Sequence, residues 1–436
     1  MSDKVIASYK GFDKNMKCRG FQYEVGKEYE IDGEIECCNR GFHACKSPME
    51  VWNYYDMLNS RYAEVEQSGK IDEEENTTKI CSSHIKIKAE LKLADIINIG
   101  VEWLKDITSP SKVKADGALN DNGDRRKQIG SSGNSAQIGS SGDYAQIGSS
   151  GDYAQIGSSG NSAKIGSSGN SAKIGSSGNS AKIGSSGDYA KIGSSGNSAK
   201  IGSSGNYAQI GSSGDYAKIG SSGNSAQIGS SGDYAQIGSS GNSAKIGSSG
   251  NYAQIGSSGD YAQIGSSGNS AQIGSSGDYA QIGSSGNSAQ IGSSGDYAQI
   301  GSSGDYAKIG SSGNSAKIGS SGNSAQIGSS GDYAKIGSSG NSAKIGSSGN
   351  SAQIGSSGDY AQIDSTGEDS VIMCAGNSSI AKAKVGSWIT LAEWKWSNEK
   401  KRDVPVCVKT EYVDGENIKA DTWYQLKDGE FIEVND

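Results

Sequence analysis

Apolar positions recur with a nine-residue period over more than half of the chain. Across residues 129–362 the unit Ile-Gly-Ser-Ser-Gly-(Asn/Asp)-(Ser/Tyr)-Ala-(Gln/Lys) repeats in 26 consecutive copies, and Ile is its one large apolar side chain. A helix is disfavoured, because each of the two glycines per unit would destabilise it by about 1 kcal/mol relative to alanine. Alternation instead favours a strand in which Ala145 and Ile147 point to one face while Tyr144 and Gln146 point to the other. The following Gly-Ser-Ser-Gly-Asn/Asp segment is predicted to turn, with glycine at positive φ.

One short strand and one turn cannot bury an apolar face alone, so successive units must stack and share a core. The repeats therefore predict a β-solenoid of nine-residue half-coils. A core of only Ile and Ala is thin, which favours two units and about 18 residues per coil; three units per coil is the alternative. Because stacked core positions tolerate little change, the variable sixth, seventh and ninth positions should face outward. The expected core ladder includes Ile138, Ile147, Ile237 and Ile255.

Before the repeats, residues 1–108 contain both strand-like and helix-like patterns of apolar and polar positions, which predicts a compact α+β domain. Ser47 and Glu50 form a capping-box pattern around Pro48, which predicts a helix from there through Tyr55 or beyond. A second, amphipathic helix is expected over residues 95–107, and a polar linker over 109–128. Strands are expected at 5–9, 21–25, 27–31, 34–38, 62–66 and 80–91, with a turn at Asp32-Gly33.

After Gln362 the repeat decays, and residues 363–385 are predicted to be degenerate capping coils. Residues 386–436 are rich in aromatic and β-branched residues, and Asp414-Gly415 and Asp428-Gly429 are hairpin-turn dipeptides. We therefore expect an antiparallel β-rich module that closes the solenoid. The predicted fold is mainly β: a solenoid between an α+β domain and a β cap.

Charge narrows the possible partners. The net charge is −8, but the repeats contain 11 Asp and 11 Lys and are neutral. A nucleic-acid groove should be basic, so we expect no nucleic-acid partner. No apolar run approaches the roughly 20 residues that span a bilayer, and no segment resembles a signal peptide. We expect a cytoplasmic protein that does not enter membranes and whose seven cysteines are reduced.

Cysteine and histidine gather in the N-terminal region, and they are candidate zinc ligands. Their spacing matches no standard zinc module, so buried thiols and a structural histidine are the alternative, and no cofactor is expected. The candidates are Cys37, Cys38, His43, Cys45, Cys81 and His84. Aspartate in a glycine-rich nonapeptide also resembles calcium-binding β-rolls, but Asp143 directly follows Gly142, one place early, which favours a turn role.

Several N-terminal motifs resemble an uncharacterised domain of phage and prophage proteins. They are Tyr9-Lys-Gly-Phe12, Cys18-Arg-Gly-Phe-Gln-Tyr23, Gly41-Phe-His-Ala-Cys45, Pro48 and Tyr54-Tyr55. The segments at 386–394 and 419–424 look like the C-terminal module of the same phage-type proteins. The resemblance implies a phage or prophage origin, a location in the host cytoplasm and no established activity.

Two further resemblances imply other functions. The order of Tyr9-Lys-Gly, Gly41-Phe-His43, Tyr54-Tyr55 and Arg61-Tyr-Ala-Glu-Val-Glu66 resembles ADP-ribosyltransferases. That resemblance implies that His43 would bind a nicotinamide nucleotide and that Glu64 or Glu66 would be catalytic. A charged face on an exposed strand is the alternative for both glutamates. The Tyr- and Ser-rich repeats loosely resemble bacterial ice-nucleation proteins, although Thr-x-Thr rows are absent and Lys interrupts the faces.

We expect a non-enzymatic phage or prophage accessory protein. Its solenoid would act as a spacer or as a display and interaction surface, binding a protein partner or a second copy. In an 18-residue coil, tyrosines two units apart would stack at about 4.7 Å and form an aromatic contact surface. The residues expected on that surface are Tyr144, Tyr153, Tyr261, Tyr279 and Tyr297.

Overall fold

The computed structural model describes residues 5–74, 77–107, 118–121 and 128–435, and the chain divides into two compact units, residues 1–236 and 237–436. The predicted mainly β architecture is confirmed. In the described residues, helical structure is limited to the 3-10 helix η1 (Pro48–Asn53) and the helix α1 (Leu93–Ile107). The first unit contains the N-terminal domain and the earlier repeats, and the second contains the later repeats and the cap.

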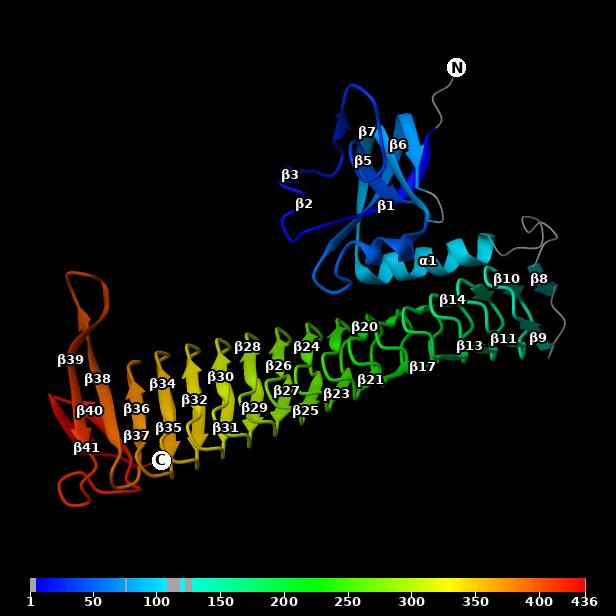
Figure 1. Cartoon of the computed structure of the whole chain (residues 1–436). Helices are drawn as coiled ribbons and strands as arrows, with labels where there is room; N and C mark the ends of the chain where they lie inside the picture. The colour runs from blue at the N-terminus through cyan, green and yellow to red at the C-terminus, as the bar shows by residue number, and fades with distance from the viewer. Residues whose placement is uncertain (1–4, 75–76, 108–117, 122–127, 436) are drawn as a thin grey trace. The chain divides into compact units, whose positions relative to one another are not determined.

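An antiparallel sheet forms the N-terminal domain (Figure 1). The long strands β6 (Arg61–Glu73) and β7 (Lys79–Leu91) pair with each other, and the sheet continues from both. Its other strands are β1 (Ile6–Phe12), which pairs with β5 and β6, β5 (Phe42–Cys45), which also pairs with β7, and β4 (Glu28–Glu30) on the far side of β7. The inward face packs Phe12, Phe42, Val65, Ile85 and Ile87 into one core.

Two predicted details of this domain are wrong. The capping box does not form: Ser47 makes no side-chain cap bond, and the helix is the short η1. The Glu50 carboxylate instead accepts hydrogen bonds from the Thr78 N–H and hydroxyl, at 2.7 and 2.5 Å. The strand predicted over residues 34–38 does not form. The chain closes a tight turn there, in which the Arg40 and Glu36 backbones bond each other. Separately, β2 (Lys17–Cys18) and β3 (Phe21–Gln22) form a small hairpin.

The repeats form a β-solenoid with one four-residue strand per nonapeptide. The strands start with β9 (Gln128–Ser131) and recur every nine residues to β35 (Gln362–Ser365). Each strand pairs in parallel with the strand 18 residues away: Ile138 lies beside Ile156 in the first unit, and Ile264 beside Ile282 in the second. Even-numbered strands therefore form one sheet and odd-numbered strands another, which confirms two repeats per coil.

The boundaries of strand and turn differ from the prediction by about two residues. The strand is Gln/Lys-Ile-Gly-Ser, so its last serine, as in Ser149, lies in the strand and points into the core. Ala145 is buried just before the strand, while Tyr144 lies in the turn and is half exposed. The core is thus a stack of Ile, Ala and Ser, and the outward positions of each strand are Gln/Lys and Gly.

The repeat glycines do not supply the left-handed turn conformation. In most repeats from Tyr216 onward, positive φ occurs at the seventh position, which is Ser or Tyr: φ is 58° at Tyr297 and 57° at Ser315. The sixth residue ties the coils together. The Asp296 carboxylate accepts the Asn314 N–H at 2.7 Å, and the Asn314 side chain accepts the Asp332 N–H at 3.0 Å. Asn and Asp are therefore structural turn residues here, as favoured over calcium ligands.

The solenoid starts earlier than predicted. β8 (Ala118–Asp121) falls inside the expected linker, yet it pairs in parallel with β10 (Gln137–Ser140). Residues 109–117 and 122–127, the rest of that linker apart from Gln128, lie outside the described residues, as does residue 108. The sequence did not predict this strand, because the segment is polar and lies before the first regular nine-residue repeat.

At the other end, imperfect coils and an antiparallel module close the solenoid. β36 (Val371–Cys374) and β37 (Ile380–Lys382) continue the two sheets, with Ala381 beside Ile363. β38 (Trp388–Ser397) stacks in parallel on β36 and turns back as β39 (Arg402–Tyr412). β40 (Tyr424–Lys427) and β41 (Glu430–Glu433) form a hairpin beside β37, and its Asp428-Gly429 turn has positive φ at both residues. Asp414-Gly415 opens a loop instead, in which the Asp414 carboxylate accepts three backbone N–H groups.

Candidate interaction faces and a cysteine–histidine cluster

The two sheets of the solenoid present flat outward faces made of glycine and glutamine or lysine. In the second unit the strand pattern is exposed, buried, exposed, buried on both sheets, as in β26 (Gln281–Ser284) and β27 (Gln290–Ser293). The serine hydroxyls of the strands point inward, so the flat faces carry no rows of hydroxyls. The ordered feature of these faces is a row of exposed glycines beside a row of longer polar side chains.

In the first unit, one face is covered by the N-terminal domain. Helix α1 lies over the even strands β12 (Gln155–Ser158), β14 (Lys173–Ser176), β16 (Lys191–Ser194) and β18 (Gln209–Ser212) (Figure 1). The outward glycines give it room: a Cβ on Gly175 would lie 2.9 Å from Leu104, and one on Gly211 would lie 2.8 Å from Ile97. A Cβ on Gly193 would overlap Met49 of η1. Bare glycine is thus what lets this apolar helix surface approach the sheet.

Polar contacts fix the position of the domain along the sheet. The outward side chains of four successive even strands each contact η1 or the segment that follows it. Lys173 pairs with Glu50, and Lys191 donates to Asn53. Gln209 then donates to the Trp52 carbonyl at 3.1 Å, and Gln227 accepts the Met57 N–H at 3.4 Å. We call Lys173, Lys191, Gln209 and Gln227 the docking ladder.

Two ionisable groups of this contact are buried. Glu50 is 5% exposed and Lys191 is 7% exposed. Burial alone would raise the pKa of Glu50, but the Lys173 ammonium and the Thr78 hydrogen bonds outweigh it and lower the pKa. Burial, with the nearby Lys173 charge, lowers the pKa of Lys191 to about 8. The docked domain therefore holds a charge pair and a second ammonium whose burial is costly at neutral pH.

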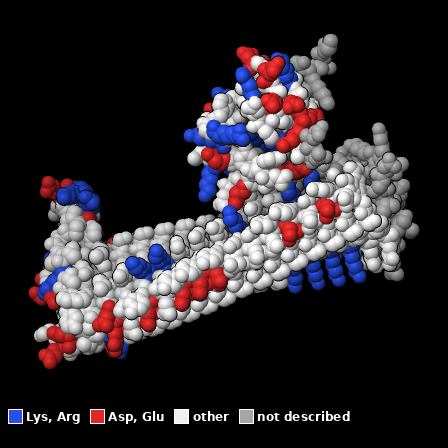
Figure 2. Space-filling view, in the orientation of Figure 1, with Lys and Arg blue, Asp and Glu red and all other residues white. Residues whose placement is uncertain are grey.

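The second unit repeats the first three residue types of the docking ladder on an exposed face. Lys317 lies beside Lys335, and Lys335 beside Gln353, on successive even strands. All three side chains are exposed, and the outward Gly319 and Gly337 have open space above them. On the odd strands of the first unit, lysines also follow in register, and Figure 2 shows lysine side chains in such a row along the repeats. That row is Lys164, Lys182, Lys200 and Lys218.

Tyrosines line the turns at the edge of the faces. Tyr261, Tyr279 and Tyr297 stack, with ring centroids 5.6 and 5.0 Å apart and planes within 13° of parallel. These three side chains, with Tyr144 and Tyr153, are 47–63% exposed. The ladder expected from the sequence is thus present as a geometric feature. The expected core residues Ile138, Ile147, Ile237 and Ile255 are all at most 3% exposed.

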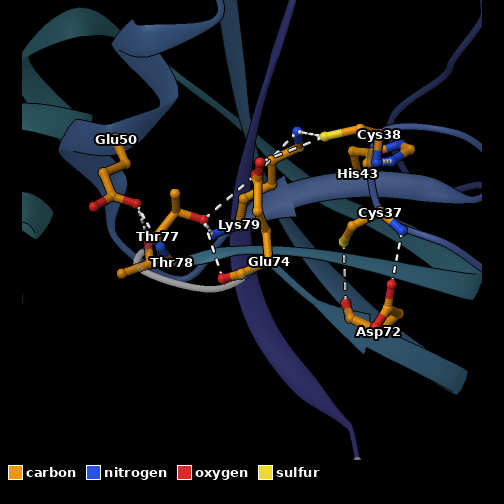
Figure 3. Close-up of polar contacts among 9 residues, drawn as sticks. All are labelled: Cys37, Cys38, His43, Glu50, Asp72, Glu74, Thr77, Thr78 and Lys79. Atoms are coloured by element: carbon orange, nitrogen blue, oxygen red, sulfur yellow. Dashed lines mark hydrogen bonds and ion pairs between the residues drawn. The ribbon is translucent and has the colours of Figure 1, made fainter.

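The N-terminal domain brings three of the six candidate zinc ligands together. One donor atom from each of Cys37, His43 and Cys81 lies within 4.8 Å of the others. The Cys37 backbone N–H donates to the Asp72 carboxylate at 2.8 Å (Figure 3). The Cys38 side chain instead points to the Lys79 ammonium, which lies 2.7 Å from its sulfur. The Cys38 N–H donates to His43 Nε2 at 2.9 Å, so Nε2 carries no proton and its lone pair accepts this hydrogen bond on the side of the cysteines.

Burial sets the protonation states of this cluster. Burial, followed by the charges of Lys10 and Lys79, lowers the pKa of His43 to about 4, so the imidazole is neutral at pH 7. Burial, followed by the hydrogen bond with Cys37, raises the pKa of Cys81 to about 12. The remaining candidates lie elsewhere: Cys45 packs in the core beneath η1, and His84 bonds Ser68 and faces Glu28.

The structure also places the residues of the ADP-ribosyltransferase reading. Glu64 and Glu66 are on β6, and Glu66 pairs with Lys88 at 2.8 Å. His43 is on β5, where the charged groups that shift its pKa are Lys10, Lys79 and Arg19 rather than either glutamate. Among the described residues, no hydrogen bond or ion pair joins His43 to either glutamate. The sequence analysis did not predict that the N-terminal domain packs on the solenoid. Two features could have indicated this contact: an outward glycine in every repeat, and an amphipathic helix just before the repeats.

The chain is a tandem-repeat β-solenoid protein with an N-terminal α+β domain. Residues 6–99, a stretch that ends within α1, match a family described as a domain of unknown function (DUF7666). No curated protein and no solved structure matches the chain. In the part of the chain that the structure describes, no helix is long and apolar enough to cross a membrane.

Proposed function

We propose that this protein is a non-enzymatic display scaffold whose solenoid faces bind helical segments. The observation that carries the proposal is the seating of η1 and α1 on an outward glycine row, with the docking ladder fixing their position. Glycine leaves space for apolar side chains, and lysine or glutamine beside it selects acidic and amide groups. The same face chemistry recurs, exposed, in the second unit.

The free face at Lys317, Lys335 and Gln353 defines the chemistry of its partner. That partner presents a helix with Leu, Ile or Met toward the glycines and an acidic side chain toward the lysine pair, as η1 and α1 do on the docking ladder. Two adjacent exposed ammonium groups repel each other, so an acidic partner relieves that repulsion as well as adding an ion pair.

The chain itself supplies a probe of this chemistry. Changing Gly193 and Gly211 to Leu fills the docked face and should release the N-terminal domain of that chain. The labelled released chain is then mixed with full-length chain of wild-type sequence, and association is measured by sedimentation. We expect the two chains to associate. The substitutions Lys317→Glu and Lys335→Glu in the full-length chain should abolish this association. The pair Lys308→Glu and Lys344→Glu makes the same charge change on the odd strands and should leave association unchanged.

Equal association with both charge-reversed chains, or none with the wild-type chain, would contradict the proposed face. The control is well matched because Lys308 and Lys344 are exposed and equally charged but are separated by Gln326 in their sheet. A general electrostatic effect would therefore respond to both pairs of substitutions, whereas a specific face responds to one.

The scaffold would act in a phage or prophage setting, which the sequence resemblance alone supports. In that setting the N-terminal domain and the cap would be anchored or recognised, and the repeats would separate and present them. The test compares the proteins that the chain captures from induced and from uninduced host cells. The chain with Lys317→Glu and Lys335→Glu is the control bait. A partner specific to induced cells and lost with these substitutions supports the setting; identical capture from both cells counts against it.

A further inference from the structure

Two stretches of the sequence, residues 37–43 and the strand that contains Cys81, hold the cysteine–histidine cluster. Cys37 lies in the turn before β5, His43 is on β5 and Cys81 is on β7, where it is the direct cross-strand neighbour of His43. The sheet therefore fixes the last two side chains on one face. The turn is fixed too, because the Cys37 N–H is bonded to Asp72 and the Arg40 backbone is bonded to Glu36.

The donor atoms are of one chemical kind. Two thiols and an imidazole suit a borderline-soft ion such as Zn²⁺, whereas Ca²⁺ and Mg²⁺ prefer oxygen. Zn–S bonds of about 2.3 Å and Zn–N bonds of about 2.0 Å place tetrahedral ligands roughly 3.5 Å apart. Since the three donors already lie within 4.8 Å of one another, shifts of side chains alone can close the site.

We propose that Cys37, His43 and Cys81 bind one Zn²⁺ ion. On binding, the two thiol protons leave to solvent and two thiolates and a neutral imidazole remain, so the site carries no net charge. His43 offers the Nε2 lone pair that now accepts the Cys38 N–H, and that N–H is exchanged for the metal. The ion would join the turn at Cys37 to β5 and β7, where the turn is otherwise held by a few hydrogen bonds.

The other thiols and the second histidine of the domain provide matched controls. Cys45 is buried against Met49 and Trp52 rather than against the cluster. His84 is also on β7, three residues from Cys81, but its ring bonds Ser68 at 2.9 Å. Cys407, in β39 of the second unit, is partly exposed and serves as an internal reference for thiol reactivity.

The test is a titration of full-length, chelator-treated protein with Zn²⁺ in competition with a chromophoric chelator. We expect one tight equivalent, at least tenfold weaker after Cys37→Ser or His43→Gln and unchanged after Cys45→Ser or His84→Gln. Co²⁺ in place of Zn²⁺ should give a thiolate charge-transfer absorption that Cys37→Ser reduces. Binding that survives Cys37→Ser together with Cys81→Ser would overturn the proposal, as would no stoichiometric binding by the wild-type chain.

A second readout does not depend on whether any variant folds. In the wild-type chain, Zn²⁺ should slow alkylation of Cys37 at least tenfold, relative to Cys407 in the same molecule. Unchanged relative alkylation overturns the site. So does oxidation of Cys37 and Cys81 to a disulfide by an added disulfide reagent, which takes up the two electrons, at the same rate with and without stoichiometric Zn²⁺, because bound thiolates cannot react freely.

Discussion

At the residue scale, the two glycines of each repeat have different roles. The fifth-position glycine lies against the coil before it: a Cβ on Gly277 would overlap the carbonyl oxygen of Gly259. The second-position glycine points outward, and a Cβ on Gly283 would have nothing within 4 Å. Neither role uses positive φ. The fifth-position glycine sets the spacing of the coils, and the second-position glycine keeps the face flat.

We expect Gly277→Ala to destabilise the second unit by roughly 3 kcal/mol, because the coils must separate to admit the methyl group. Gly283→Ala adds the same methyl group in open space and should change stability by less than about 0.5 kcal/mol. Urea denaturation with far-UV circular dichroism measures both. Similar midpoints for the two variants would show that the close approach at Gly277 does not limit the coil spacing.

A second residue-scale prediction concerns the left-handed turn position. Ser315 has φ 57°, which costs an L-residue about 1 kcal/mol and a β-branched residue more. Ser315→Val should therefore lower stability by about 1–2 kcal/mol, whereas Ser315→Asn should be neutral or stabilising, since Asn tolerates this conformation. Thermal melting of the two variants tests this, and a Val variant as stable as the Asn variant would argue against the turn conformation.

At the scale of elements, the docking of η1 on the even sheet should depend on pH. An exposed lysine keeps its proton to about pH 10.5, but docked Lys191 loses it near pH 8. Between these values the undocked state binds more protons, so docking should strengthen as the pH rises from 8 to 10. Glu50 acts at the acid end: its pKa is lowered in the docked state, so docking should weaken as the pH falls through its ordinary value and below.

Lys191→Met keeps the apolar stem and removes the titrating group. The urea midpoint for loss of amide protection in α1, measured by pulsed hydrogen exchange, should rise between pH 8 and 10 in the wild-type chain. The variant should show no such rise. Lys182→Met, on the exposed odd sheet, is the control and should behave like wild type. A rise that persists in the Lys191 variant would assign the pH dependence to another group.

The sequence predicted the elements that repeat and missed the contacts between unlike elements. A nine-residue Ile period was enough to predict stacking and two repeats per coil, because one apolar residue per strand leaves few ways to build a core. It misplaced Ser149 in a turn because serine and glycine favour turns in isolation, whereas the stacked coil can bury a small hydroxyl. It assigned Glu50 to a local cap, although Thr78 and Lys173 take the carboxylate in the fold.

The candidate site was only partly predictable for the same reason. The sequence named six possible zinc ligands but could not separate them, because Cys37 and Cys81 meet only through the pairing of β5 with β7. Cys45 is two residues from His43 and still belongs to the core beneath η1. Pairing between strands, rather than spacing along the chain, decides which side chains share a site.

At the scale of the whole molecule, a parallel solenoid has an inherent hazard at its ends. The last regular coil exposes the backbone N–H and C=O groups of its strands, which can pair with another chain. Here the coil formed by β36 and β37 is covered by β38 and by the β40–β41 hairpin. The antiparallel direction of that hairpin breaks the parallel stacking, and the cap therefore protects the edge as well as completing the core.

Removing residues 386–436 should therefore cause self-association without unfolding the repeats. The truncated chain is expected to form concentration-dependent oligomers in sedimentation, with a circular dichroism spectrum that still shows β-structure. Adding Val371→Lys and Met373→Lys, at the exposed positions of the new edge strand, should return it to the monomer, because charges on an edge oppose strand pairing. If the truncated chain stays monomeric, the imperfect coil of β36 and β37 protects the edge by itself; if the lysine variant still associates, the contact lies on the faces rather than at the edge.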